Sequence, residues 1–212
     1  MAEVTPGFKD GDKMDKKNYR PISILSSVSK IFEKIIYRQV EEQMNVHLSP
    51  YLCGFRAGYS TQYCLLGMLE KWKKALDKKN IAGALITDLS KAFDCINHEL
   101  LIAKLEAYGA DIKMLQYVSS YLSGRKQRTK VNNAFSTWAN ILSGVPQGSI
   151  LGPLLFNIYI NDIFLFVSEK CLANYADDNT PHAMDKNVDL LLQTLSNDAN
   201  ILIGWFNDNY FL

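Results

Sequence analysis

Three aspartates have the residue type and spacing of a metal-dependent phosphoryl-transfer site. Asp88 follows a short apolar run that predicts a buried strand, and Asp177 and Asp178 join two stretches that predict a hairpin. Adjacent carboxylates repel unless a cation lies between them, and Mg²⁺ prefers such hard oxygen ligands. Two ions about 3.5–4 Å apart can activate an attacking hydroxyl and stabilise the leaving oxygen. The spacing alone leaves another interpretation open, because Asp-Asp is a common turn pair and an Asp after a strand often caps a helix.

The elements expected to position these aspartates are short strands and amphipathic helices. A buried strand is predicted over 81–87, and the strands of the hairpin over 170–176 and 179–184, where two such strands can lie side by side in one sheet. A second hairpin is predicted from the basic run 125–130, with 138–142 as its return strand. Helical spacing and capping residues predict helices over about 26–44, 60–79, 97–108, 111–122 and 188–206. A glycine-rich loop over 144–153 leads into a further apolar helix that ends near Phe166.

Two of these helices carry apolar residues at helical spacing along one face. On the helix over 26–44, six apolar residues follow helical spacing: Val28, Ile31, Phe32, Ile35, Ile36 and Val40. On the helix over 60–79, the apolar face is Leu65, Met68, Leu69 and Trp72. The preceding segment, 5–18, is expected to be an extended, polar, lysine-rich lead-in.

The composition is that of an ordinary globular protein with an uneven charge. Its 212 residues are 48% hydrophobic and 21% charged, which excludes wholesale disorder and allows a sizeable buried core. The net charge of +1 does not indicate a nucleic-acid binder. However, residues 1–40 hold eight basic and five acidic residues, and residues 161–212 hold two basic and eight acidic ones. One end is therefore suited to phosphates, and the other concentrates carboxylates as a metal site would.

Cysteine spacing and apolar segments argue against three other classes of protein. The four cysteines have no C-x-x-C spacing, which argues against a zinc site or a disulfide framework and favours buried thiols in a reducing compartment. The N-terminal residues lack the apolar stretch of a secretory signal. The longest apolar run, 150–167, contains Pro153 and three polar residues, so no membrane partner is expected.

Five motifs, in order along about residues 5–206, resemble those of reverse transcriptases. The strings are N-Y-R-P-I-S at 18–23, G-F-R at 54–56, G-A-L-I-T-D-L-S-K-A-F-D at 83–94, S-G-V-P-Q-G-S-I-L-G-P at 143–153 and Y-A-D-D at 175–178. A lone Y-A-D-D string is a weak signal, whereas five motifs in family order are highly specific. The pattern is most similar to that of non-LTR, LINE-type retrotransposons, the jockey-like elements of animals.

The resemblance implies an α+β fold with the fingers and palm of a right-hand polymerase. An antiparallel palm sheet would pack on helices, with fingers over about 1–82 and 99–140 and palm over about 83–98 and 141–212. The family normally continues into a further palm strand, a primer-gripping hairpin and a helical thumb. The sequence therefore implies a chain truncated before the thumb, either a piece of a longer polyprotein or a decayed copy.

The resemblance also assigns Asp88, Asp177 and Asp178 as the catalytic carboxylates. Asp88 and Asp177 would bind two Mg²⁺ ions, for which Mn²⁺ can substitute. Asp178 would support them, and the backbone carbonyl of Leu89 would face one ion. The implied reaction is attack of a primer 3′-hydroxyl on the α-phosphorus of a deoxynucleoside triphosphate. An RNA template directs the choice of nucleotide, and pyrophosphate leaves.

Four further residues match family positions that contact the incoming nucleotide. Arg20 would bind the triphosphate, and the Phe93 ring would crowd a ribose 2′-hydroxyl and so favour deoxynucleotides. Gln147 and Gly148 would pack against the nucleotide and the template base. Two structural alternatives stay open: Phe93 as a core phenylalanine, and Gln147 with Gly148 as a simple turn.

Basic residues in two segments are expected to contact nucleic acid. Arg56 would contact the template backbone, and four cations of the 125–130 run would contact phosphates: Arg125, Lys126, Arg128 and Lys130. A hairpin with solvated charges is the alternative for this run. The implied partners are an RNA template, a DNA primer, deoxynucleoside triphosphates and the endonuclease and thumb domains of a parent polyprotein. The expected location is intracellular, in the nucleus by family analogy, with the cytoplasm as the alternative.

Two other functions compete with reverse transcription. A catalytically incompetent or domesticated fragment would bind nucleic acid only; the truncation favours this, and the intact aspartates oppose it. An RNA-templated RNA polymerase is opposed by Phe93. Asn179 and Pro181 depart from the family pattern after the aspartate pair. Because proline cannot donate to a sheet ladder, Pro181 predicts that the second hairpin strand is edge-like there.

Overall fold

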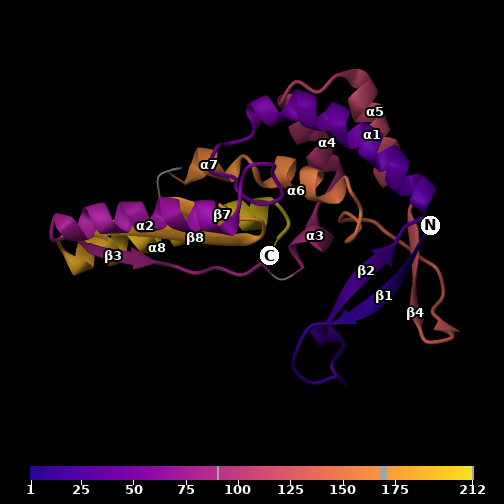
Figure 1. Ribbon diagram of the computed structural model, residues 1–212, viewed down its shortest axis with the longest axis horizontal. Helices are drawn as coiled ribbons and strands as arrows, with labels where there is room; N and C mark the ends of the chain where they lie inside the picture. Colours follow the sequence, from indigo (N-terminus) through magenta and orange to yellow (C-terminus); the bar gives the residue numbers. More distant parts are fainter. Residues whose placement is uncertain (90, 168–170, 212) are drawn as a thin grey trace. The chain divides into compact units, whose positions relative to one another are not determined.

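The computed structural model describes residues 1–89, 91–167 and 171–211 (Figure 1). The chain forms two compact units, Met1–Val46 with Phe93–Ile158, and His47–Ala92 with Tyr159–Leu212. Both units combine helices with a sheet, which confirms the predicted α+β class. The fingers and palm boundaries given above divide the chain differently and stay a prediction.

The first unit contains a five-stranded sheet in the order β2-β1-β4-β5, with β6 also paired to β4. β1 is antiparallel to β2 and parallel to β4, and Glu3 lies opposite Arg128 in the β1–β4 register. Residues 5–8, expected in the polar lead-in, belong to β1. The hairpin predicted from 125–130 and 138–142 is confirmed, because β4 pairs antiparallel with β6. The strands are β1 (Ala2–Phe8), β2 (Tyr19–Ile24), β4 (Lys126–Val131), β5 (Ala134–Phe135) and β6 (Ala139–Asn140).

The helices of the first unit begin at the capping residues that the sequence indicates. The side chains of Ser26, Asn97 and Asp111 accept hydrogen bonds from backbone N–H groups three residues later, at 3.2, 3.0 and 2.8 Å. Gly109 and Gly124, which follow two of the helices, have positive φ angles of 84° and 62°. The helices are α1 (Ser27–Met44), α3 (Ala92–Cys95), α4 (His98–Ala107), α5 (Ile112–Leu122) and α6 (Gly152–Ile160), with short 3₁₀ turns at Lys16–Asn18 and Asn45–His47.

The buried face of α1 differs from the apolar face that the sequence indicates. Val28, Ile31, Phe32 and Ile35 are exposed, and the buried residues of this helix are Glu33, Val40 and Met44. The helical spacing is as predicted, but the apolar face is exposed to solvent along the first half of the helix. Glu33 takes the core position instead, because its carboxylate accepts hydrogen bonds from the backbone N–H groups of Ile150 and Leu151.

The second unit is a three-stranded sheet with a helix on each face. The sheet order is β3-β8-β7, and both pairs are antiparallel. A Cβ on Gly83 would face Leu191 of α8, whereas His182 of β8 meets Trp72 of α2 with ring centroids 6.4 Å apart. Gly83 pairs with Ala183, which is adjacent to His182 in β8, and adjacent residues of a strand point to opposite faces. Therefore α8 and α2 cover opposite faces of the sheet. The elements are α2 (Thr61–Asp77), β3 (Ile81–Ala84), α7 (Ile163–Phe166), β7 (Leu172–Tyr175), β8 (Asp178–Asp185) and α8 (Val188–Asp208).

Several predicted bounds in the second unit need correction. The apolar helix predicted up to Phe166 is two helices, α6 and α7, separated at 161–162. The Asn161 side chain accepts from the Ser49 N–H at 2.7 Å and donates to the His47 carbonyl at 3.0 Å. The predicted hairpin strand 170–176 corresponds to β7, and residue 170 lies outside the described residues. No helix among the described residues is long and apolar enough to cross a membrane.

Pro181 lies in the central strand of its sheet, so the prediction of an edge-like strand is wrong. The Pro181 carbonyl accepts from the Leu85 N–H at 2.9 Å. The N–H and C=O groups of one strand residue point to the same side, so the N–H that proline lacks would also have faced the segment that contains Leu85. The continuous β3–β8 ladder ends at Ala84, one residue before Leu85. The ladder therefore breaks where the proline can donate nothing, and the strand keeps its partner on the other side.

Candidate active site

The three aspartates lie at one end of the sheet in the second unit. In the antiparallel register of β3 and β8, Ala84 pairs with His182, and an isolated bridge joins Thr87 to Asn179. The Thr87 N–H and hydroxyl both donate to the Asn179 carbonyl, at 3.2 and 2.7 Å. One step further along this register, Asp88 lies opposite Asp178. The structure therefore brings the strand-end aspartate to the aspartate pair.

The carboxylates repel one another in the absence of a cation. The pKa of Asp178 is raised above its ordinary value, first by partial burial and then by the charges of Asp177 and Asp88. Among the described residues, no three His, Cys, Asp or Glu side chains are already arranged to hold a metal ion. The donor chemistry nevertheless fits a hard divalent cation, which would relieve the repulsion among these oxygens.

Buried asparagines shape the turn that carries Asp177. Ala176 has a positive φ of 56°, a backbone conformation that non-glycine residues rarely adopt. The Asn174 amide donates to the Ala176 carbonyl and to the Asn179 side chain, both at 3.0 Å. Asn179 in turn donates to the Asp177 carbonyl at 3.1 Å. The departure from the family pattern at Asn179 is thus part of the network that holds this turn.

Gly54 backs directly onto the same turn. A Cβ on Gly54 would lie 2.3 Å from the Ala176 backbone nitrogen and 2.6 Å from its Cα, so a larger residue would displace the turn. Leu52 forms a bridge with Asn174 close by, and the Cys64 thiol donates to the Asn174 carbonyl at 3.5 Å. The G-F-R motif therefore packs behind the aspartates, which spacing alone did not predict.

Gln147 and Gly148, by contrast, lie in a tightly held loop of the first unit. The Gln147 amide donates to the Asp94 carboxylate at 3.3 and 3.4 Å, and the Gln147 carbonyl accepts from the Ser23 N–H at 2.9 Å. Gly148 has a φ of 102°, which favours glycine. Phe93 stacks on Phe156 with ring centroids 4.6 Å apart, and Arg20 is exposed on β2.

Glu33 anchors the far side of this loop, a role that no motif in the sequence indicated. Its side chain is 3% exposed and accepts from the Ile150 and Leu151 N–H groups at 2.7 and 3.4 Å. The Tyr121 hydroxyl donates to it at 3.2 Å. These N–H groups precede α6, where a carboxylate is favoured by the helix dipole. The available signal was the spacing of seven residues between Glu33 and the buried Val40, which places both on one helix face.

Several predicted nucleic-acid-binding cations have contacts within the protein. Arg56 donates to the carbonyls of Ser49 and Leu52 at 2.6 and 3.2 Å, and its guanidinium lies 4.6 Å from the Tyr59 ring centroid. Arg125 donates to the Tyr121 carbonyl at 3.3 Å. Arg128 forms an ion pair with Glu3. Lys126 is exposed, and Lys130 is half-buried.

Comparison with known families identifies the chain. The family described as "Reverse transcriptase (RNA-dependent DNA polymerase)" matches residues 9–208. The chain belongs to the reverse transcriptase family. Members of this family normally use divalent metal ions, which agrees with the donor chemistry of the three aspartates.

The similar proteins in this family are retrotransposon polymerases. The chain is 36% identical over 167 residues to "Probable RNA-directed DNA polymerase from transposon X-element" of Drosophila melanogaster, covering 76% of this chain and 18% of that protein. It is 32% identical over 187 residues to "RNA-directed DNA polymerase from mobile element jockey" of Drosophila funebris, covering 84% and 20%. The chain therefore spans about a fifth of the length of these relatives.

Solved structures with a similar fold include telomerases. The chain superposes on the apo telomerase of Candida tropicalis truncated from its C-terminal domain with a TM-score of 0.58 and 15% identity, covering 85% of this chain and 44% of that one. For telomerase of Candida albicans the TM-score is 0.56 and the identity 12%, covering 99% and 40%. These similarities support a polymerase fold of the reverse transcriptase type.

Proposed function

We propose that the chain is the catalytic portion of an RNA-directed DNA polymerase that serves the transposition of a non-LTR retrotransposon. The observation that carries this proposal is the strand register that places Asp88 opposite Asp178, with Asp177 in the adjoining turn. Family membership supplies the reaction class, which is templated transfer of deoxynucleotides to a primer 3′-hydroxyl. We assign the fingers to 1–82 with 99–140 and the palm to 83–98 with 141–212.

In this proposal Asp88, Asp177 and Asp178 are the catalytic carboxylates. Together with the Leu89 carbonyl they would hold two Mg²⁺ ions, for which Mn²⁺ can substitute. Such ions supply charge stabilisation for the attacking and leaving oxygens. The protein's own contribution is positioning: two paired strands and the asparagine network fix where the carboxylates lie, so little reorganisation is needed during the reaction.

The nucleotide contacts are proposed for Arg20, Phe93, Gln147 and Gly148. Arg20 is exposed and would pair with the triphosphate, since a guanidinium matches phosphate geometry. Gln147 and Gly148 would meet the nucleotide and the template base from a loop that Asp94 and Ser23 hold in place. Phe93, stacked on Phe156, would act as the steric gate against ribonucleotides.

Binding partners and location follow from the same proposal. The chain would bind an RNA template, a DNA primer and deoxynucleoside triphosphates, and it would work with the endonuclease and thumb domains of a parent polyprotein. Arg56, Arg125, Lys126 and Lys130 would contribute to nucleic-acid binding directly. Arg128, which is paired with Glu3, would contribute through the aromatic rings that it contacts. The proposed location is intracellular, in the nucleus where the DNA target lies, or in the cytoplasm.

Primer extension on a primed RNA template tests this function. We expect Mg²⁺-dependent extension by the full chain and a loss of about 10²-fold or more for Asp177→Asn, because removing a metal ligand costs several kcal/mol of transition-state stabilisation. Asp208→Asn, at the end of α8, is the matched control and should retain activity. Binding without extension would contradict the proposal and favour a binding-only fragment. Preferential incorporation of ribonucleotides would favour an RNA polymerase.

A further inference from the structure

The hairpin of β4, β5 and β6 gathers cations and aromatic rings on one face. Because side chains alternate along a strand, Lys126, Arg128 and Lys130 of β4 point to the same face. Phe135 of β5 pairs directly with Lys130 in the antiparallel register, so its ring lies on that face as well. The chain thus presents three cations and an aromatic ring side by side.

Two aromatic rings on this hairpin are both accessible and held in place. Phe135 is 48% exposed and Trp138 is 42% exposed. The Arg128 guanidinium lies 4.1 Å from the Phe135 ring centroid and 4.8 Å from the Trp138 ring centroid. The Lys130 ammonium lies 5.4 Å from the Phe135 ring centroid. The rings are therefore ordered by a shared cation, while a large part of each remains open to solvent.

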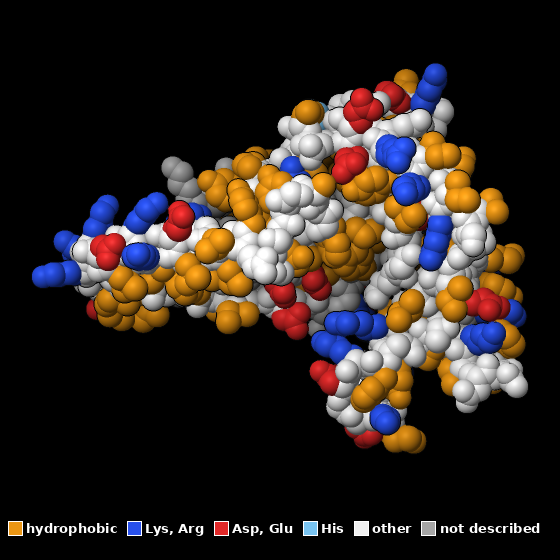
Figure 2. Space-filling view, viewed as in Figure 1, with side chains coloured by type: hydrophobic (Ala, Val, Ile, Leu, Met, Phe, Trp, Pro, Cys, Tyr) orange, Lys and Arg blue, Asp and Glu red, His pale blue; other side chains and the backbone are white. Residues whose placement is uncertain are grey.

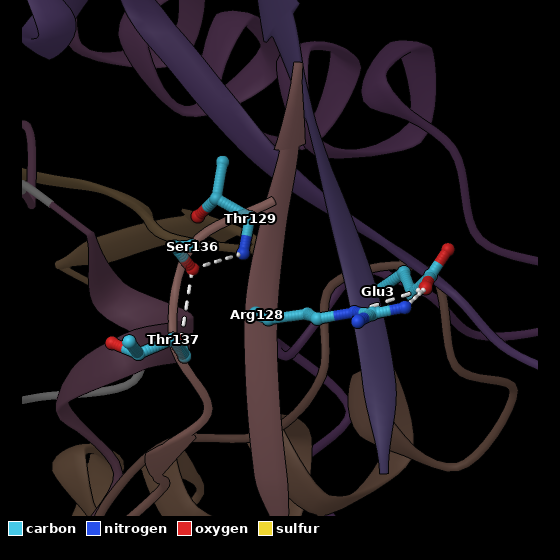
Figure 3. A network of polar contacts seen from close by, with 5 residues as sticks. All are labelled: Glu3, Arg128, Thr129, Ser136 and Thr137. Carbon is cyan, nitrogen blue, oxygen red and sulfur yellow. Dashed lines mark hydrogen bonds and ion pairs between the residues drawn. The ribbon is translucent and has the colours of Figure 1, made fainter. Parts of the chain in front are cut away.

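Arg128 is better suited to ordering these rings than to binding a phosphate. Its guanidinium reaches across from β4 to the Glu3 carboxylate of β1, which neutralises its charge (Figure 3). The return segment is fixed too, since the Thr129 N–H donates to the Ser136 hydroxyl at 2.9 Å, and that hydroxyl donates to the Thr137 carbonyl at 3.0 Å. Lys126 and Lys130 are the cations left on this face to meet phosphates.

We propose that this face binds single-stranded nucleic acid, whose bases stack on Phe135 and Trp138 and whose phosphates lie near Lys126 and Lys130. Aromatic rings next to cations suit a single strand, because only unpaired bases expose their faces for stacking. A duplex would offer phosphates but no stacking partner. This proposal rests on the proposed function, for which the face would hold a substrate strand. The binding of that strand requires no catalysis.

Equilibrium binding of oligonucleotides to the full chain tests this surface. The probes are a 15-mer of uridylate, a 15-mer of thymidylate and a blunt duplex of the same length. One readout is the tryptophan fluorescence, of which the Trp138 share is the part that Trp138→Ala removes. We expect both single strands to bind alike, to quench Trp138 and to bind more tightly than the duplex. Phe135→Ala and Trp138→Ala should each weaken binding about 5- to 150-fold, the equivalent of ~1–3 kcal/mol per stacked base.

Matched variants separate stacking from charge and from folding. Phe8→Ala removes an exposed ring from β1 of the same sheet and should leave binding unchanged. Phe135→Tyr and Trp138→Tyr should retain binding, which keeps the test decisive if an alanine variant unfolds. Lys126→Gln should reduce the salt slope of binding by about one. Asp208→Asn, which lies outside both sites, should bind like the parent chain. Because this binding is measured without nucleotide or Mg²⁺, loss of catalysis and loss of this surface are distinguishable.

Several results would overturn the proposal. They are the absence of single-strand binding by the parent chain, unchanged affinity in both alanine variants, and equal affinity for the duplex. The last result would show that the hairpin meets only phosphates. A strong preference for uridylate over thymidylate would contradict recognition by base stacking alone.

Discussion

The ionised form of Asp178 is disfavoured in the folded protein, and removing its charge should therefore change the stability. Its pKa is raised by burial and by Asp177 and Asp88, so the ionised form destabilises the folded state as pH rises through the raised pKa. Asp178→Asn removes that charge and should stabilise the fold at neutral pH by about 0.2–1 kcal/mol, a range suited to a group that is only partly buried and largely exposed. The gain should vanish below about pH 4, where the carboxyl is protonated in both folded and unfolded chains.

Thermal unfolding across pH, with and without Mg²⁺, measures this effect. If the three aspartates share a cation, Mg²⁺ should raise the Tm of the parent chain more than that of Asp178→Asn at neutral pH. Asp10→Asn, an exposed acid of the first unit, is the control and should leave both responses unchanged. Parallel pH profiles for the parent chain and Asp178→Asn would show that the carboxylates do not interact in solution.

At the scale of elements, the strand-end aspartates show how far local sequence signals reach. The apolar run before Asp88 and the hairpin around Asp177 were predicted, and the structure confirms that their strands pair. Capping by Asn97 and Asp111 was predictable because each cap acts within three residues. The roles of Asn174 and Asn179 were not predictable, because buried amides gain their partners only after the strands have folded together.

Long-range pairing explains the main errors at this scale. The parallel pairing of β1 with β4 joins segments more than 120 residues apart, and no local sequence pattern predicts such a pairing. Glu33 interrupts an apolar helix, and a charge in such a position normally faces water. Its burial follows from the N–H groups before α6, which belong to a segment more than 100 residues away.

Glu33 should therefore stabilise the junction between α1 and α6. Glu33→Ala would leave the Ile150 N–H and the Tyr121 hydroxyl without their acceptor, and we expect a loss of about 1–3 kcal/mol in the free energy of unfolding. Glu33→Gln keeps one acceptor oxygen and should lose less. Denaturant unfolding compares the two variants with Glu42→Ala, an exposed acid on the same helix that should change stability little. Equal stability of Glu33→Ala and the parent chain would contradict this role.

One helix of each unit exposes a set of large apolar side chains to solvent. On α1 these residues are Val28, Ile31, Phe32 and Ile35, and on α2 they are Leu65, Leu66, Leu69 and Leu76. Figure 2 shows hydrophobic side chains gathered along the helices of the second unit. Contiguous exposed apolar surface promotes association, because its burial between molecules removes it from water.

We therefore expect the purified chain to self-associate as its concentration rises. Replacing Ile31 and Ile35 together with Gln should reduce this association, as should replacing Leu65 and Leu69 together with Gln, because each pair lies on one exposed helix face. Since these side chains make few buried contacts, the free energy of unfolding should change by less than about 0.5 kcal/mol per site. Sedimentation velocity over a range of concentrations measures the effect. Lys30 and Lys34 replaced together with Gln provide the matched control on α1 and should not reduce association. If neither apolar pair alters the sedimentation profile, these faces do not drive association, and whatever contact the chain makes with itself lies elsewhere.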